Sequence, residues 1–319
     1  MALLAVLAPA LGAASAGAQT PPPVVTPDEA EQAVRDWYAT SYRATETLDS
    51  DLLATVESAP LLTIDQADFQ YRRDEDKPYE NLVAEPDSID VFVPRQTEYP
   101  AQFVAKLDVA GSTQYFEFVR ESAESPWRTP YQAAADGFPA LPSPIAVDRD
   151  GYATLVPIDT TKLKVAPGAV PDRLVRYLSR YEEQTLPNSK PFHAGPATSD
   201  NMKAIRARAR EVDATYEFEI LTAPHAAYRT KDGGALVFFG YSSREQAEAP
   251  GGGSLRVQPT GLPGTQVPPG RYLSTDTTRN TLVAAAVPKA TPKSGRVTIV
   301  GRYTGSVAAT GVPKGPSGA

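Results

Sequence analysis

Residues 26–38 read TPDEAEQAVRDWY, and residues 171–181 read PDRLVRYLSRY. Each stretch has a proline at or next to its start, Pro27 and Pro171, which favours the first turn of a helix, and then repeats apolar residues at the spacing of one helical face. In the first stretch, Thr26 and Glu29 also have the spacing of a capping box. A second helical or turn segment and a series of alternating strands follow each helix. The same order of elements therefore occurs twice along the chain.

Alternation of apolar and polar residues predicts the strands, because successive side chains of a strand point to opposite faces of a sheet. The predicted strands cover residues 89–93, 103–107, 115–120, 152–156, 216–220, 235–241, 281–287 and 296–303. Ala110-Gly111 is a predicted hairpin turn. Helices followed by a meander are typical of α+β proteins. We expect two tandem domains, each with N-terminal helices packed on a curved antiparallel sheet.

The first residues resemble an export signal. An apolar run from Ala2 to Leu11 is followed by small residues, and it is shorter than the roughly 20 residues that span a bilayer. No later segment predicts a transmembrane helix. The expected organisation is a signal peptide at 1–18, a Pro-rich exposed spacer at 19–26, domains at 27–160 and 168–305, and a disordered tail at 306–319.

Charge differs between the two halves of the 319-residue chain. Residues 1–160 carry 10 basic and 26 acidic residues, a net charge of −16, and residues 161–319 carry 21 and 12, a net charge of +9. Opposite fields favour electrostatic docking of the two domains, or contact of the basic half with an anionic partner, although ordinary surface variation also produces such differences. With no cysteine in the chain, disulfides and thiolate metal sites are excluded.

Three phrases carry a resemblance to a known family: VFVPRQTEYPAQFVA at 91–105, HAGPATSDN at 193–201 and RTKDGGALVFF at 229–239. They resemble secreted actinobacterial proteins that share a domain of unknown function. The order of elements is similar to tandem nuclear transport factor 2-like, or cystatin-like, cone folds. The resemblance implies an uncharacterised secreted or cell-envelope protein, and it supplies no catalytic residues.

Candidate catalytic groups are few. His193 and His225 are the two histidines, and an imidazole titrates near neutrality and so can act as a general base, but both lie in predicted loops, where surface or structural roles are common. Four aromatic residues on predicted strands are candidates for a ligand pocket, or alternatively for simple core filling: Tyr216, Phe218, Phe238 and Tyr241.

The helix after Thr198 carries a basic face. Lys203, Arg206 and Arg210 recur at spacings of three and four residues, so they share one side of the helix. This face predicts contact with an envelope polyanion or with the acidic domain, or else it is only the solvated side of the helix. The acidic chain predicts no nucleic-acid partner, and no spacing of residues predicts a metal or a cofactor.

The composition and motifs favour a non-enzymatic binding or scaffolding module of the envelope, with an unknown envelope polymer or protein as partner. Two alternatives remain open. One is a pocket enzyme, isomerase- or dehydratase-like, that uses His193 or His225. The other is a carrier of a small hydrophobic ligand in a cone cavity.

Overall fold

The computed structural model of the chain describes residues 22–185, 187–258, 261–291 and 295–315. The predicted signal peptide at 1–18 lies outside the described residues. Helices are α1 (Pro27–Thr47), α2 (Ser50–Leu53), α3 (Leu61–Asp74), α4 (Val170–Leu178) and α5 (Ser199–Val212), with short 3-10 turns at Pro167–Ala169 and Pro250–Gly252. Strands are β1 (Ser88–Phe92), β2 (Ala101–Val109), β3 (Ser112–Arg120), β4 (Arg128–Ala134), β5 (Leu155–Val156), β6 (Ala214–Thr222), β7 (Ala227–Arg229), β8 (Ala235–Glu248), β9 (Leu255–Val257), β10 (Gly270–Val287) and β11 (Thr298–Pro313).

The local predictions for helix α1 and the first hairpin are confirmed. Thr26 Oγ1 accepts a hydrogen bond from the Glu29 backbone N–H at 3.3 Å, and a Glu29 carboxylate oxygen accepts one from the Thr26 backbone N–H at 2.8 Å. These two bonds form the capping box and satisfy N–H groups that the helix leaves unpaired. Ala110 and Gly111 both have positive φ angles, as a two-residue hairpin turn between twisted strands requires.

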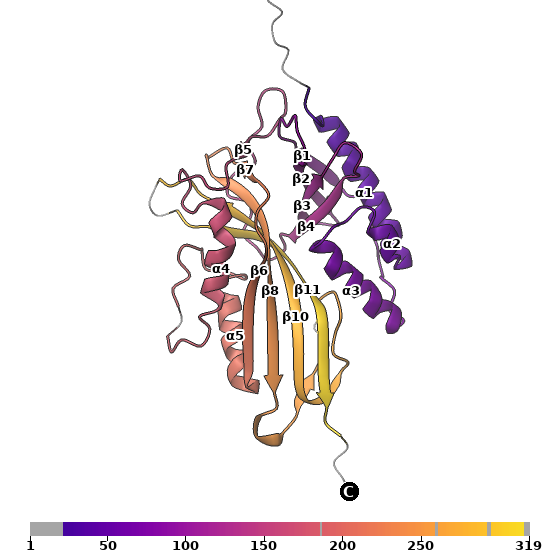
Figure 1. Cartoon of the computed structure of the whole chain (residues 1–319), viewed down its shortest axis with the longest axis vertical. Coiled ribbons are helices and arrows are strands. Elements are labelled where there is room, and N and C mark those ends of the chain that lie inside the picture. Colours follow the sequence, from indigo (N-terminus) through magenta and orange to yellow (C-terminus); the bar gives the residue numbers. More distant parts are fainter. Residues whose placement is uncertain (1–21, 186, 259–260, 292–294, 316–319) are drawn as a thin grey trace, which may run out of the picture.

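The fold is α+β, with a curled antiparallel half-barrel sheet. The described strands form a single 11-stranded sheet in the order β1-β2-β3-β4-β11-β10-β8-β7-β5, while β6 pairs with β8 and β9 with β10. The long strands β6, β8, β10 and β11 run side by side (Figure 1). Strand β11 pairs with β10 along most of its length and with β4 through Arg302 and Ala134. The acidic and basic halves therefore share one sheet.

One hydrophobic cluster draws on both halves of the chain. Leu61 and Ile64 of α3 and Tyr131 of β4 pack with Phe238 of β8 and Leu282 of β10. Gly305 of β11 lies so close to α3 that a Cβ there would collide with the Ile64 side chain. A shared apolar interior and a shared sheet, rather than docking of opposite charges, join the two halves, and the predicted arrangement of two separate domains is not confirmed.

Separate clusters occupy the rest of the interior. On the opposite face of the long strands, Leu174 and Leu178 of α4 and Met202 of α5 pack on Phe239 and Val283. Figure 1 shows α4 and α5 beside β6, and α1 to α3 grouped on the side of β1 to β4 and β11. Alternation along β8 places Phe238 and Phe239 in different clusters.

Both predicted terminal segments differ from expectation. Residues 306–313 of the predicted disordered tail belong to β11, because the pairing of Tyr272 with Pro313 extends the β10 ladder to that point. The end of the predicted exposed spacer is also docked, since Val25 is buried and the Val24 N–H donates to the Gln96 carbonyl at 2.7 Å. Among the described residues, no helix is both long enough and apolar enough to cross a membrane.

The shared interior predicts one cooperative unfolding unit. Phe239 is fully buried among residues of the basic half, and truncation of such a residue typically costs about 3–5 kcal/mol. Both tryptophans, Trp37 and Trp127, lie in the acidic half, so their fluorescence reports unfolding of that half. If the halves unfold together, Phe239→Ala in the basic half should still lower the denaturation midpoint that tryptophan fluorescence reports. The shift should match the one reported by circular dichroism. Two transitions, with the fluorescence midpoint unchanged, would contradict a single unit.

Candidate functional site

A cavity of about 380 Å³ lies between helices α1 to α3 and the sheet. Aromatic side chains form much of its wall, and they include Trp37, Tyr38, Tyr42, Phe69, Tyr79 and Phe116. Polar groups are also aimed into it, among them Glu57, Asp65, Gln114, Gln132 and Tyr303. A concave, mostly aromatic cavity with a few converging polar groups is the usual form of a small-molecule site.

Two carboxyl groups meet in this cavity. Glu57 lies in the connection that follows α2, and Asp65 lies in the first half of α3. The connection is held to β4 by a hydrogen bond that the Ser58 N–H donates to the Thr129 carbonyl. Glu57 is only 3% exposed, and its Oε2 has no hydrogen-bond donor among the described residues. Asp65 is half-buried and reaches solvent where it lines the cavity. Burial of the first carboxyl beside the second makes a doubly ionised pair unfavourable.

The titration of the pair follows from this placement. Burial raises the pKa of Glu57, and the neighbouring Asp65 carboxyl raises it further. Burial also raises the pKa of Asp65, to about 7, although hydrogen bonds from the Tyr303 hydroxyl and from Glu57 oppose that rise. The Tyr303 hydroxyl donates to Asp65 Oδ1 at 2.6 Å. Near neutral pH the pair therefore holds a shared proton.

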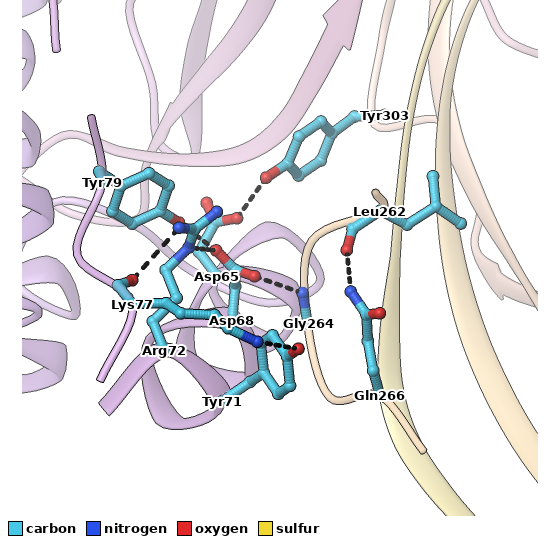
Figure 2. Close-up of polar contacts among 10 residues, drawn as sticks. All are labelled: Asp65, Asp68, Tyr71, Arg72, Lys77, Tyr79, Leu262, Gly264, Gln266 and Tyr303. Carbon is cyan, nitrogen blue, oxygen red and sulfur yellow. Dashed lines mark hydrogen bonds and ion pairs between the residues drawn. The ribbon is translucent and has the colours of Figure 1, made fainter. Parts of the chain in front are cut away.

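Asp68, one helical turn after Asp65, anchors the site to the rest of the protein. It accepts hydrogen bonds from Arg72 Nε at 2.7 Å, from the Gly264 N–H at 2.7 Å and from the Tyr79 hydroxyl (Figure 2). The Arg72 guanidinium lies 3.7 Å from the centre of the Tyr79 ring. Because Gly264 lies in the loop between β9 and β10, Asp68 connects α3 to that loop. A fully satisfied carboxylate of this kind holds the neighbouring Asp65 in place.

The chemistry available to the cavity follows from these groups. A shared proton allows the singly charged pair to donate one hydrogen bond and to accept others, and loss of that proton leaves two negative charges beside aromatic faces. Both states favour a ligand that carries N–H or O–H donors on an apolar body. The part of the chain that the structure describes contains no group of three or more histidine or acidic residues that could hold a metal ion.

Three of the four predicted pocket aromatics come together elsewhere. Tyr216, Phe218 and Tyr241 line a second cavity, of about 290 Å³, between α5 and the inner face of β6 and β8. Phe238 does not join them, because an odd spacing from Tyr241 along β8 turns it to the opposite face, against Tyr131. The inclusion of Phe238 in one pocket with Tyr241 is therefore wrong.

Neither histidine lines the two cavities described above. His193 is exposed in the loop before α5, where its backbone N–H donates to the Val297 carbonyl at 2.8 Å. The His225 side chain is 47% exposed, and its Nδ1 lies 3.4 Å from Oε2 of the fully buried Glu117. A hydrogen bond with Glu117 raises the pKa of His225, and burial raises the pKa of Glu117. His225 thus covers a buried acid at the surface.

The predicted basic face is divided by its contacts. Arg206 donates to the carbonyl oxygens of Gln184 and Thr185 at 3.2 and 3.1 Å, so it fixes the chain after α4. Lys203 pairs with the exposed Asp200 at 3.1 Å, and Arg210 is exposed. Exposed pairs of this kind contribute little to stability. The contact of this basic face with a polyanion therefore stays a prediction.

The model of a family described as a domain of unknown function, DUF8094, matches residues 21–311. The chain belongs to this family. The match spans both halves of the DUF8094 protein, as the shared sheet does. The predicted link to a family of unknown function is thereby confirmed, whereas the resemblance to nuclear transport factor 2-like folds is not.

A protein from another organism is also similar to this DUF8094 chain. An uncharacterized lipoprotein from Streptomyces coelicolor is 28% identical over 246 residues, which cover 73% of this chain and 71% of that protein. No solved structure matches the chain. The actinobacterial part of the predicted resemblance is thus confirmed.

The acid pair predicts how stability depends on pH. A folded-state pKa of about 7 for Asp65 lies above its value in the unfolded chain, so the folded protein binds more protons between roughly pH 4 and 7 and loses stability as the pH rises. We expect Asp65→Asn, which keeps an acceptor for Tyr303, to raise stability at about pH 8 by on the order of 2 kcal/mol. Near pH 4 the effect should vanish. Denaturant unfolding at both pH values measures the difference, and equal effects at both would contradict the raised pKa.

Proposed function

We propose that this DUF8094 protein is an exported, envelope-associated protein that binds a small organic ligand in the cavity under α1 to α3, without covalent chemistry. The lipoprotein relative supports an envelope location, and the apolar run at Ala2 to Leu11 supports export. The ligand is an organic amine with an apolar, preferably aromatic, body.

One observation carries this proposal: buried Glu57 and half-buried Asp65 meet at the wall of a cavity, and Glu57 Oε2 lacks a donor within the described part of the chain. Replacement of a buried ionisable pair by apolar residues is often neutral or stabilising, so such a pair is weak as a device for stability. Titratable groups with strongly raised pKa values gather instead at functional sites. A ligand that donates to Glu57 Oε2 would supply the missing partner.

The nature of the walls supports an amine as that donor. An ammonium group on the ligand would meet the carboxyl pair and displace its shared proton, giving charge-assisted hydrogen bonds. Aromatic faces such as Trp37, Tyr42 and Phe116 line the same space and attract both cations and apolar rings. A carrier of a purely hydrophobic ligand has less support, because it would leave Glu57 Oε2 without the donor that it lacks among the described residues.

An enzyme that uses His193 or His225 has less support than a binding protein. His193 contacts the chain through its backbone, and His225 faces solvent beside a carboxyl that is itself inaccessible. A general base must reach a substrate held in a cavity. The imidazoles lie outside the cavity of the acid pair.

Calorimetric titration with 2-phenylethylamine and with 2-phenylethanol tests the ligand class. The amine should bind more tightly than the alcohol, and its affinity should increase from about pH 5 to pH 8, because binding favours the doubly ionised pair and releases a proton below the pKa of Asp65. Glu57→Gln should weaken amine binding about tenfold or more, the loss expected for a charge-assisted bond. Binding of the alcohol should change by less than about twofold, a difference within ordinary context effects.

Glu75→Gln provides the matched control, because Glu75 follows α3 at its exposed end. This variant should bind the amine as the unmodified protein does. Equal affinity for amine and alcohol, or equal weakening by Glu57→Gln and Glu75→Gln, would refute the assignment.

A further inference from the structure

The inner face of the long strands is polar where a packed core would be apolar. Two adjoining cavities of about 280 and 290 Å³ lie along it, and Arg208, Glu245 and Arg279 line both. Hydroxyl groups point into these cavities from successive strands, namely Ser243, Thr275, Thr277, Thr281, Thr304 and Ser306. The concave side of the half-barrel therefore forms a groove lined by hydroxyl and guanidinium groups, which we call the inner groove.

Positive charge exceeds negative charge in the inner groove. Glu245 accepts from Arg208 Nε at 3.1 Å and from an Arg279 guanidinium nitrogen at 3.0 Å, and its side chain is only 11% exposed. Burial alone would raise the pKa of Glu245, but the charges and hydrogen bonds of the two arginines outweigh burial and lower it. Two guanidinium groups thus share one carboxylate, which leaves one positive charge uncompensated.

Arg302 adds a second such charge. It is half-buried in the wall of the same groove, beside Tyr241 and Thr304, and none of the ion pairs found among the described residues includes it. Arg256 contributes a further guanidinium at the other end. Glu245 is the sole carboxylate that lines either cavity within the described ranges. Guanidinium groups in a partly enclosed site favour an oxyanion such as phosphate or carboxylate.

The outer face of the same strands shows the opposite pattern. Arg244, adjacent to Glu245 on β8, pairs with Asp276 of β10 through both carboxylate oxygens at 2.6 to 3.1 Å. The charge of this arginine is therefore balanced by a neighbouring strand. In the groove, by contrast, Glu245 alone faces the guanidinium groups of Arg208, Arg279 and Arg302 among the residues that the structure describes.

Aromatic rings form one wall of the groove. The rings of Tyr216 and Phe218 are stacked with centroids 6.2 Å apart, and Tyr241 lies 6.5 Å from Phe218. Along the other wall, the Thr265 N–H donates to the Ser306 carbonyl at 2.8 Å, which fixes the loop that also brings Gln266 and Val267 to the groove. Aromatic faces with surrounding hydroxyl donors and acceptors suit a ring that carries hydroxyl groups.

We propose that the inner groove binds a hydroxylated organic anion, a sugar that carries a phosphate or carboxylate group, with Arg302 and the Arg208–Arg279 pair holding the anionic group. This second site is distinct from the cavity of Glu57 and Asp65, and it lies on the opposite face of the sheet. This groove includes the predicted aromatics Tyr216, Phe218 and Tyr241. The basic residue of α5 that lines it is Arg208, whereas Lys203 and Arg210 do not line it.

Calorimetric titration of the full chain with glucose 6-phosphate, glucuronate, glucose and inorganic phosphate tests this assignment at constant ionic strength. At least one of the anionic sugars should bind at least about tenfold more tightly than glucose, since a charge-assisted hydrogen bond supplies that difference. The anionic sugar that binds better identifies phosphate or carboxylate as the preferred group. Equal affinity for glucose, or for inorganic phosphate alone, would refute a site for a sugar anion.

Arg302→Gln is the decisive variant, because no carboxylate of the described residues pairs with Arg302, so the substitution leaves no buried carboxylate of that part of the chain uncompensated. We expect its affinity for the better-binding anionic sugar to fall about tenfold or more, with an unchanged circular dichroism spectrum and thermal midpoint. Arg244→Gln, on the outer face of β8, is the matched control and should bind normally. No difference between the two variants, or failure of both anionic sugars to bind, would overturn the proposal.

Discussion

The pairing of β11 between β10 and β4 is the constraint on which the rest of the structure depends. Through the long ladder with β10 and the contact of Arg302 with Ala134, β11 joins the meander of the acidic half to the long strands of the basic half. Because neighbouring residues of a strand face opposite sides, this pairing also directs Tyr303 toward the acid pair and Arg302 toward the inner groove. A shift of register by one residue would exchange the two.

The two faces consequently have different chemistry. Beneath α1 to α3 the groups that converge are carboxyl, phenol and aromatic, and on the other face they are guanidinium and hydroxyl. The loop between β9 and β10 contacts both faces, since the Gly264 N–H donates to Asp68 while the adjacent Thr265 lines the inner groove. A Cβ at Gly264 would collide with the Ser306 carbonyl, so only glycine permits this close approach of the loop to β11. The loop is the physical link between the two cavities.

The opposite net charges of the two halves suggested docking of two domains, but in the folded protein both halves share one sheet. The net charges of −16 and +9 belong to two parts of one sheet, and their interior contact is apolar. An ion pair between His225 and Glu117 does cross from one half to the other, but it lies at the edge of that contact. The charges that matter for binding are local: an acid pair in the acidic half and uncompensated arginines in the basic half.

The sequence by itself determined the elements whose causes are local. Thr26 and Glu29 predicted the start of α1, Ala110-Gly111 predicted a hairpin, and alternation at Tyr216 to Ile220 predicted the strand β6, although Tyr216 and Phe218 are only partly buried and Ile220 is exposed. Each depends on residues within a few positions of one another. Strand alternation also places Tyr216, Phe218 and Tyr241 on one face of the sheet, where they line one cavity. The same rule excluded Phe238, which the sequence analysis had grouped with them.

Only the tertiary structure decided the acid pair and the joining of the halves. Glu57 and Asp65 lie eight residues apart, in a short connection and in a helix that the sequence analysis had not assigned, whereas Tyr303 lies in a distant strand. Burial creates their chemistry, since a carboxyl beside a second carboxyl acquires a raised pKa only where water is excluded. Likewise, nothing local specifies that β11 lies beside β4. At that contact Gly301 of β11 lies against the Ala133 and Ala134 carbonyls of β4, and Gly305 lies against Ile64 of α3, so the position of β11 is fixed by elements distant in the sequence.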